Sequence, residues 1–193
     1  MVALALFLAL LIYYPVIVKE VGYVINKPNA NATVSTNYVL DSRNSNVIIA
    51  TDPNFSIIVP KIGANSRVVP DVDPYNSLVY QRELTKGVAH AKGTVYPRQV
   101  GNSFYFAHSS DNFYNANRYN SVFYLLDKMS IGDAFYLVYK GDIYKYKVTE
   151  VNVVAPDSVK YISLETSKKL ATLMTCWPAG TTLKRLVVVG ELE

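Results

Sequence analysis

Apolar and polar residues alternate with a period of two along much of the second half of the chain. The clearest case is residues 134–156, where two alternating runs flank the short segment Lys140-Gly141-Asp142. In the second run apolar and aromatic side chains share one face and polar side chains share the other: Tyr144, Tyr146 and Val148 against Lys145, Lys147 and Thr149. The pattern predicts a β-hairpin with one face in a core and one in water.

Other short apolar runs predict more strands, at residues 47–50, 55–63 and 102–108. Two further runs close the chain, residues 170–176 and 184–193, and a turn-like connection, WPAGTTL, joins them. A connection of this length suits neighbouring antiparallel strands. We therefore expect Cys176 and Arg185 to lie at the same end of two adjacent strands.

Two segments favour short helices instead. Residues 75–84 form one, and residues 121–129 form the other, which Ile131-Gly132-Asp133 would end. The second carries apolar residues at helical spacing: Val122, Leu125, Leu126 and Met129.

The N-terminus is uncharged from Val2 to Val18 and would cover about 25 Å as a helix, near the short limit for a membrane span. A cleaved signal peptide is the competing interpretation, but the run lacks a basic n-region and a small-x-small site. We predict a membrane anchor over residues 1–20, with Tyr13 and Tyr14 at the interface and Lys19 outside it. Residues 21–46, rich in Asn, Ser and Thr, predict an extracytoplasmic linker before a folded domain over 47–193.

Composition supports a folded, mostly β domain after this linker. Half of the 193 residues are hydrophobic, and 16 tyrosines outnumber 7 phenylalanines, which suits half-buried strands. The net charge of +4 comes from scattered basic residues, which gives little support for nucleic-acid binding. A single cysteine excludes any disulfide within the chain, so Cys176 is a free thiol unless two chains pair.

Cys176 is the candidate for chemistry, since peptide chemistry at a thiolate needs a proton donor for the leaving amine and a donor for the oxyanion. Histidine and arginine suit these tasks, and the chain has two histidines, His90 and His108. Composition does not choose between them. A lone cysteine beside Leu173 and Trp177 is also typical of a small buried core residue.

Three segments in one order resemble the sortase family of surface transpeptidases. They are GTVYPRQVGNSFYFAHSS at residues 93–110, TLMTC at 172–176 and KRLVVVGEL at 184–192. The segment IVPKIGANSRVV at 58–69 is similar to the opening of sortase domains. The resemblance spans about Ile57 to Leu192, and its most specific part is Thr-Leu-x-Thr-Cys followed by an arginine nine residues later.

The resemblance, to sortases of class D or E, implies an all-β fold: a closed eight-stranded β-barrel with short helices, preceded by an N-terminal membrane anchor helix. It carries a catalytic triad onto His108, Cys176 and Arg185 and leaves His90 outside. Thr175 and Trp177 are the candidates for substrate or oxyanion binding. The chain departs from the family pattern at Ala107, where the family has glycine, and at Arg98 and Val100.

The implied activity is cysteine transpeptidation on a C-terminal LPxTG-like sorting signal of secreted proteins, through a thioacyl-enzyme. The implied acceptor is an amine of a lipid II-type cell-wall precursor or a pilin lysine, and the catalytic domain would lie outside the cell membrane. We expect no metal or other cofactor. Some sortases bind calcium in a loop, but the loop carboxylates here are scattered: Asp71, Asp73, Asp111 and Asp133.

Two alternatives remain open at this point. One is a surface-anchored, non-catalytic β-barrel that binds or scaffolds other proteins. The other is a cysteine peptidase that hydrolyses surface peptides, although the chain has no papain-like CGSCW motif and Met174-Thr175 precede Cys176-Trp177.

Overall fold

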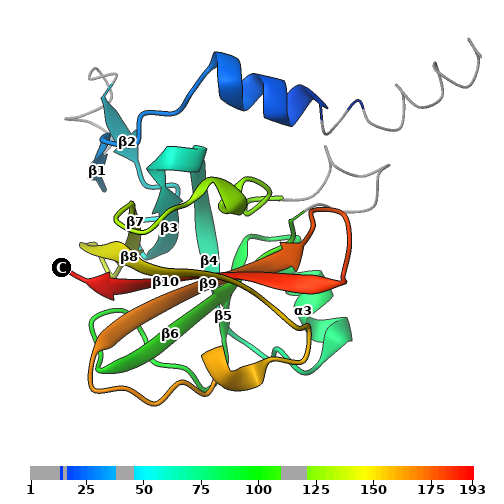
Figure 1. Ribbon diagram of the computed structural model, residues 1–193. Coiled ribbons are helices and arrows are strands. Elements are labelled where there is room, and N and C mark those ends of the chain that lie inside the picture. The colour runs from blue at the N-terminus through cyan, green and yellow to red at the C-terminus, as the bar shows by residue number, and fades with distance from the viewer. Residues whose placement is uncertain (1–13, 15–16, 38–45, 110–120) are drawn as a thin grey trace, which may run out of the picture.

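Eight strands close into a β-barrel in the computed structural model, which describes residues 14, 17–37, 46–109 and 121–193. Around the barrel the strand order is β10-β8-β7-β3-β4-β5-β6-β9 (Figure 1). The strands are β3 (Phe55–Val59), β4 (Ala64–Val72), β5 (Val88–Ala91), β6 (Gly101–Phe106), β7 (Ala134–Tyr139), β8 (Asp142–Val154), β9 (Lys169–Trp177) and β10 (Lys184–Leu192). The predicted eight-stranded barrel is therefore confirmed.

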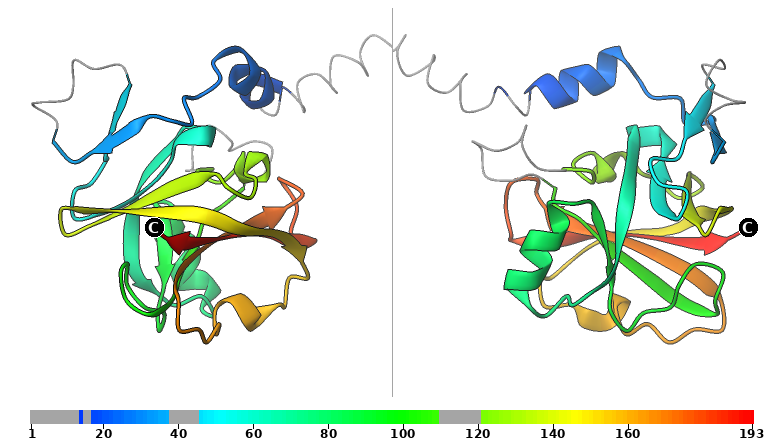
Figure 2. Two further views of the ribbon diagram at one scale, coloured as in Figure 1. Left: turned by 60° about the vertical axis from the view of Figure 1, so that its left-hand side comes forward. Right: turned by 180° about the vertical axis from the view of Figure 1, so that it is seen from behind.

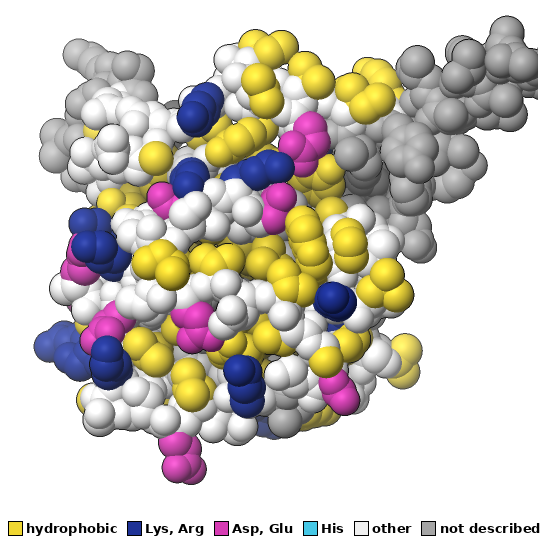
Figure 3. Space-filling model, in the orientation of Figure 1, with side chains coloured by type: hydrophobic (Ala, Val, Ile, Leu, Met, Phe, Trp, Pro, Cys, Tyr) yellow, Lys and Arg dark blue, Asp and Glu magenta, His cyan; other side chains and the backbone are white. Residues whose placement is uncertain are grey.

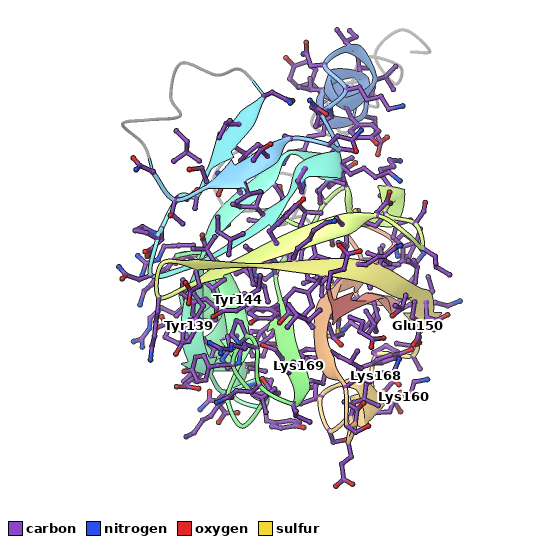
Figure 4. The ribbon with its side chains drawn as sticks, turned by 90° about the vertical axis from the view of Figure 1, so that its left-hand side faces the viewer. Tyr139, Tyr144, Glu150, Lys160, Lys168 and Lys169 are labelled. Atoms are coloured by element: carbon purple, nitrogen blue, oxygen red, sulfur yellow. The ribbon has the colours of Figure 1, made fainter. Side chains whose placement is uncertain are left out.

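The β7–β8 hairpin forms where the alternation predicted it. Tyr139 pairs with Asp142, and the two residues between them have positive φ, 53° at Lys140 and 87° at Gly141. Such angles match the twist of a two-residue hairpin turn. Figure 4 follows β8 from Tyr144 near this turn to Glu150, which lies toward the other end of the strand.

Burial on both faces distinguishes β6, β9 and β10 from this hairpin. One face of these strands contributes to a core cluster inside the barrel, with Tyr105, Leu173 and Leu186 among its members. The other face contributes to a second cluster that includes Phe106 and Val187. Strands covered on both sides have nearly continuous apolar sequences, as TLMTC and RLVVV do.

Helix α3 (Ser77–Leu84) covers part of that second cluster through Leu84, which is buried. The helix predicted at 75–84 is thus present but begins at Ser77. The Asn76 side chain explains the start, because it accepts a hydrogen bond from the Val79 N–H at 3.2 Å and caps the first turn.

The second predicted helix, at residues 121–129, is wrong as an α-helix. Backbone bonds there run from an N–H to the carbonyl three residues earlier, as from Tyr124 to Ser121 and from Leu126 to Phe123, and only η2 (Leu126–Lys128), a 3₁₀ helix, is regular. The buried apolar residues are Phe123, Leu126 and Met129, which are spaced by three. That spacing fits the three residues per turn of a 3₁₀ helix, so the core selects the tighter winding. Two more 3₁₀ turns are η1 (Pro60–Ile62) and η3 (Val159–Tyr161).

The segment predicted as a linker contributes structure of its own. Strand β1 (Thr33–Ser35) pairs in parallel with β2 (Val47–Ile49), outside the barrel. Val34 is 8% exposed and packs with Ala50, Ile58 and Val138. Burial of Val34 against the outer face of β3 and β7 explains why strand β1 forms within a polar segment.

A helix also precedes β1, over residues 17–25. Most of the predicted membrane anchor, residues 1–13 and 15–16, lies outside the described residues. Within the described ranges, the structure contains no helix with the length and apolarity to cross a membrane.

Candidate active site

Cys176 and Arg185 are direct partners in the antiparallel pair of β9 and β10. Residues directly opposite one another in such a pair point to the same face, with Cβ atoms about 5 Å apart. Both side chains are partly exposed. The structure thus brings together the thiol and the guanidinium that the sequence placed at one end of two strands.

His108 reaches the same place from β6, which runs parallel to β9. Phe106 is the partner of Met174, and the Ala107 N–H donates to the Met174 carbonyl oxygen at 3.2 Å. The same register carried two residues further places His108 beside Cys176. A histidine nearly seventy positions upstream is therefore positioned by backbone pairing and not by a flexible loop alone.

The Thr175 side chain links β9 to the residue that follows β6. Its side chain is 3% exposed, and its hydroxyl donates to the carbonyl oxygen of Ala107 at 2.9 Å. A hydroxyl has a single proton, so in this arrangement Thr175 has none left for a substrate oxyanion. What the hydroxyl does here is hold the residue before His108 against the residue before Cys176.

The Arg185 guanidinium is oriented by backbone carbonyls at the start of β10. Its Nη1 donates to the carbonyl oxygens of Thr182, at 3.1 Å, and Lys184, at 3.0 Å. No carboxylate in the described part of the chain forms an ion pair with Arg185. A fixed cation whose charge no acid neutralises is suited to hold a carbonyl oxygen as it gains negative charge.

The side chains of His108, Cys176 and Arg185 line a single cavity of about 590 Å³. Its volume is within the range of small-ligand and peptide sites. Helix α3, the β9–β10 connection and residues 156–158 and 162 of the β8–β9 connection surround the reactive groups. Helix α3 and the β9–β10 connection lie toward the same end of the barrel (Figures 1 and 2). Apolar side chains from distant segments form much of the wall: Tyr80, Leu84, Phe106, Ile162 and Met174.

Sequence reasoning missed the contributions of α3 and of the β8–β9 connection to this wall. Tyr80 and Leu84 show only a helical pattern in the sequence, and Ile162 lies in a segment without regular alternation. No local signal relates these residues to Cys176, since the barrel closure alone brings them together.

Trp177 has a different environment from the one proposed for a groove wall. It is partly buried and packs against the core cluster inside the barrel. Successive residues of a strand point to opposite faces, so Trp177 faces away from the side that Cys176 shares with the cavity. This packing accounts for the tryptophan.

His90 lies on that inner side as well. It is fully buried, pairs with Tyr105 across β5 and β6, and packs against the Tyr96 ring in a tilted arrangement, with the ring centres 4.6 Å apart. Its Nε2 lies 3.1 Å from the Val95 carbonyl oxygen, and its Nδ1 lies 3.8 Å from the Asp71 carboxylate. Burial lowers the pKa of His90 below its usual value. His90 is thus a neutral core histidine, separated from Cys176 by the sheet.

The loop carboxylates considered for calcium have other partners. Asp71 accepts from the Tyr96 hydroxyl at 2.7 Å, Asp73 accepts from the Tyr75 N–H at 2.9 Å, and Asp133 pairs with Lys61 at 2.6 Å. Asp111 lies outside the described residues. Over the ranges that the structure describes, no three His, Cys, Asp or Glu side chains group as a metal site would require.

The fold and this arrangement define a class of protein: a closed β-barrel that presents a thiol, an imidazole and a guanidinium to one peptide-sized cavity. Residues 57–193 match the family model described as the sortase domain. The chain belongs to the sortase family.

Relatives and solved structures agree with this assignment. The chain is 26% identical over 136 residues to sortase D of Bacillus subtilis and 28% identical over 137 residues to sortase A of Streptococcus agalactiae. These matches cover 69% and 70% of the chain but only 60% and 54% of the two relatives' lengths.

Among solved structures, sortase C-1 from Actinomyces oris aligns with a TM-score of 0.61 and 30% identity, over 74% of this chain and 76% of that one. Sortase A from Corynebacterium diphtheriae, a lid mutant, aligns with a TM-score of 0.61 and 26% identity, over 74% and 70%. The names cover sortases A, C and D, so what they share is the family and not one class.

Proposed function

We propose that this protein is a cysteine transpeptidase that cleaves a C-terminal, LPxTG-like sorting signal of secreted proteins and transfers the new carboxyl end to an amine. One observation carries the proposal: Cys176 and Arg185 are paired across β9 and β10, and His108 lines the same cavity. Sortase-family membership supports the same chemistry.

The first half of the reaction makes a thioester. The Cys176 thiolate attacks the carbonyl carbon of the scissile peptide bond, and the carbonyl oxygen takes up the negative charge beside the Arg185 guanidinium. His108, as imidazolium, gives its proton to the amine as the C–N bond breaks. The leaving segment departs with a neutral amine, and the acyl group stays on Sγ.

The second half transfers the acyl group. An incoming amine attacks the thioester carbon and loses a proton to His108, and the thiolate of Cys176 leaves. The enzyme returns to its starting protonation state. The apolar wall formed by Tyr80, Leu84 and Ile162 limits water near the thioester, which favours the amine over hydrolysis.

The partners in this proposal are sorting-signal peptides and an amine from a lipid II-type wall precursor or a pilin lysine. The N-terminal residues 1–20 would serve as a single-pass membrane anchor, with the catalytic domain outside the membrane. The uncharged run from Val2 to Val18 supports that anchor.

The test is to incubate the protein with a panel of sorting-motif peptides, with and without an amine acceptor, and to follow the products by mass spectrometry. We expect an acyl adduct on Cys176, its discharge onto the amine, and no adduct in Cys176→Ala. A folded protein that forms no adduct across the panel would refute the proposal. An adduct that only hydrolyses, even at high amine concentration, would identify a peptidase.

A further inference from the structure

The helix over residues 17–25 exposes a continuous apolar stripe (Figure 3). Its members are Ile17 (45% exposed), Val18 (49%), Val21 (47%), Val24 (73%) and Ile25 (73%). Val21 lies three or four positions from each of the other members, so all five lie along one side of the helix. We call these five residues the apolar stripe.

The opposite side of this helix contacts the barrel domain through polar groups. Lys19 donates to the Ser121 hydroxyl, and its Nζ lies 5.5 Å from the centre of the Tyr124 ring. Glu20 forms an ion pair with Lys128 at 3.2 Å. All three contacts are made to the segment that precedes β7.

This orientation is the reverse of the usual one. An amphipathic helix on a water-soluble domain places its apolar side against the core and its charged side in water. Here the charges face the protein and five large apolar side chains face outward. Such an exposed patch marks an interaction site.

We propose that the apolar stripe lies in the interfacial layer of the membrane and holds the barrel at a fixed orientation to the bilayer. The inference rests on the anchor in the proposed function. The uncharged run from Val2 ends at Val18, within the stripe, so a chain anchored by that run brings the stripe directly to the membrane surface. Tyr14, which is 57% exposed and precedes the stripe, suits the interface, and so does the exposed Lys27 that follows the helix.

A second copy of the chain fits the stripe less well. The helix has nine residues and is about 13 Å long. A single stripe of that length buries far less than the roughly 1,200 Å² typical of a specific interface between proteins. A membrane, in contrast, needs only one apolar side of a helix.

The attachment also orients the active site. In Figures 1 and 2 the helix lies across the top of the barrel, whereas α3, at the mouth of the cavity, lies at its side. A bilayer on the stripe would leave the cavity open beside the membrane and not covered by it.

This inference is tested by measuring how deeply a fluorescent probe on the helix lies in the bilayer. The chain has a single native cysteine, so a probe can be attached at one chosen position once Cys176 is replaced. In the Cys176→Ala background of the full chain, a fluorophore is attached at Val24→Cys or, as the matched control, at Leu78→Cys. Leu78 is an equally apolar position on α3 and is 86% exposed. Both proteins are reconstituted into phosphatidylcholine–phosphatidylglycerol vesicles, and quenching by iodide in water and by shallow nitroxide lipids is measured.

We expect the label at position 24 to be quenched several-fold more strongly by nitroxide lipid than by iodide, and the label at position 78 to show the opposite. Equal iodide quenching at the two positions in vesicle-bound protein would overturn the inference while leaving the anchor intact. Disulfide-linked dimers of the unlabelled Val24→Cys protein in the same vesicles would overturn it in favour of a second copy. Protein that fails to float with the vesicles would overturn the anchor and this inference together. Peptide transfer is assayed separately on the chain that retains Cys176, so a failure of the proposed activity is distinguished from a failure of this inference.

Discussion

A conservative substitution tests the proposed role of Arg185 directly. Its guanidinium is planar and is fixed through Nη1 to two carbonyl oxygens, so its remaining N–H groups have a defined direction. Lysine keeps the charge but has no rigid fork of donors. In the proposed mechanism arginine would therefore supply directed hydrogen-bond donors as well as a positive charge.

We predict that Arg185→Lys lowers kcat of the transfer reaction by about 10²-fold, the typical loss for a missing oxyanion donor, with a smaller change in KM. Steady-state kinetics with a sorting peptide provide the measurement. Lys184→Ala is the matched control, because only the backbone carbonyl of Lys184 contacts the guanidinium. Equal kinetics for wild type and Arg185→Lys would contradict the assignment.

Thr175 can be tested in the same way as a positioning residue. Valine has the same shape as threonine but cannot donate to Ala107, so Thr175→Val should free the segment that carries His108 and lower kcat roughly 10- to 100-fold. Thr175→Ser should restore most of the activity.

Thr172→Val is the control for stability alone. Thr172 is also buried on β9 and donates to Asn102 on β6 at 2.8 Å, but it lies three residues from Thr175 along the strand. We expect both valine variants to lose about 1 kcal/mol of unfolding free energy, measured by urea denaturation. Only Thr175→Val should change kcat and its pH profile; equal activity losses would show that Thr175 acts through stability.

At the level of elements, β10 reaches the core through a close approach at Gly190. The β10–β8 register shifts between Val189 and Gly190, next to Phe135 and Tyr146, whose rings stack 5.4 Å apart. A Cβ at position 190 would lie 2.5 Å from a Phe135 ring carbon. The irregularity and the missing side chain together let the strand pass over two large rings.

Gly190→Ala should therefore destabilise the protein by about 1–3 kcal/mol, the usual cost of overpacking a core. Thermal unfolding followed by circular dichroism measures the loss. Gly22→Ala is the control, since a Cβ there meets nothing within 4 Å. If Gly190→Ala melts with the wild type, the packing around β10 is looser than the structure indicates.

The success of sequence prediction varied from one element to the next for physical reasons. The β7–β8 hairpin has one wet face, so its alternation is visible in the sequence. Strand β5 is buried at all four positions and carries no such period, so it was not predicted. Residues 121–129 showed apolar spacing close to both helical types, and only the observed packing of Phe123 and Leu126 decides for the 3₁₀ form.

The site was predicted unevenly for a related reason. Cys176 and Arg185 are joined by a short connection, so strand pairing alone predicts their meeting. His108 belongs to a parallel partner far upstream, and the residues alone could not choose it over His90; the family resemblance made that choice. Alternation along β9 places Trp177 on the face opposite Cys176, but only the closed barrel decides which of the two faces is the inner one.

At the scale of the whole molecule, His90 links core stability to pH. Its pKa is lowered by burial, so the unfolded chain binds a proton more readily than the folded one between the folded value and the usual 6.5. Stability from this group is complete above pH 6.5 and is lost as pH falls below it. The nearby carboxylate of Asp71 opposes part of the loss.

We predict that unfolding free energy decreases below pH 6.5 with a slope of up to about 1.4 kcal/mol per pH unit from His90. His90→Gln should flatten that part of the curve, although it lowers stability at pH 8. Denaturation between pH 5 and 8 provides the measurement, with His108→Gln as the control for the other histidine. Parallel curves for wild type and His90→Gln would assign the pH response to other groups.

The parallel contact between β6 and β9 has a consequence for synthesis of the chain. It closes the barrel, and it joins segments that lie more than sixty positions apart, one leading to His108 and the other to Cys176. Since β9 and β10 are synthesised after β6, the imidazole of His108 meets the thiol and the guanidinium only once β10 has been made. On a nascent chain that stops before β10 the Cys176 thiol therefore lacks Arg185, and the assembly of all three groups in one cavity is a sign that the barrel has closed.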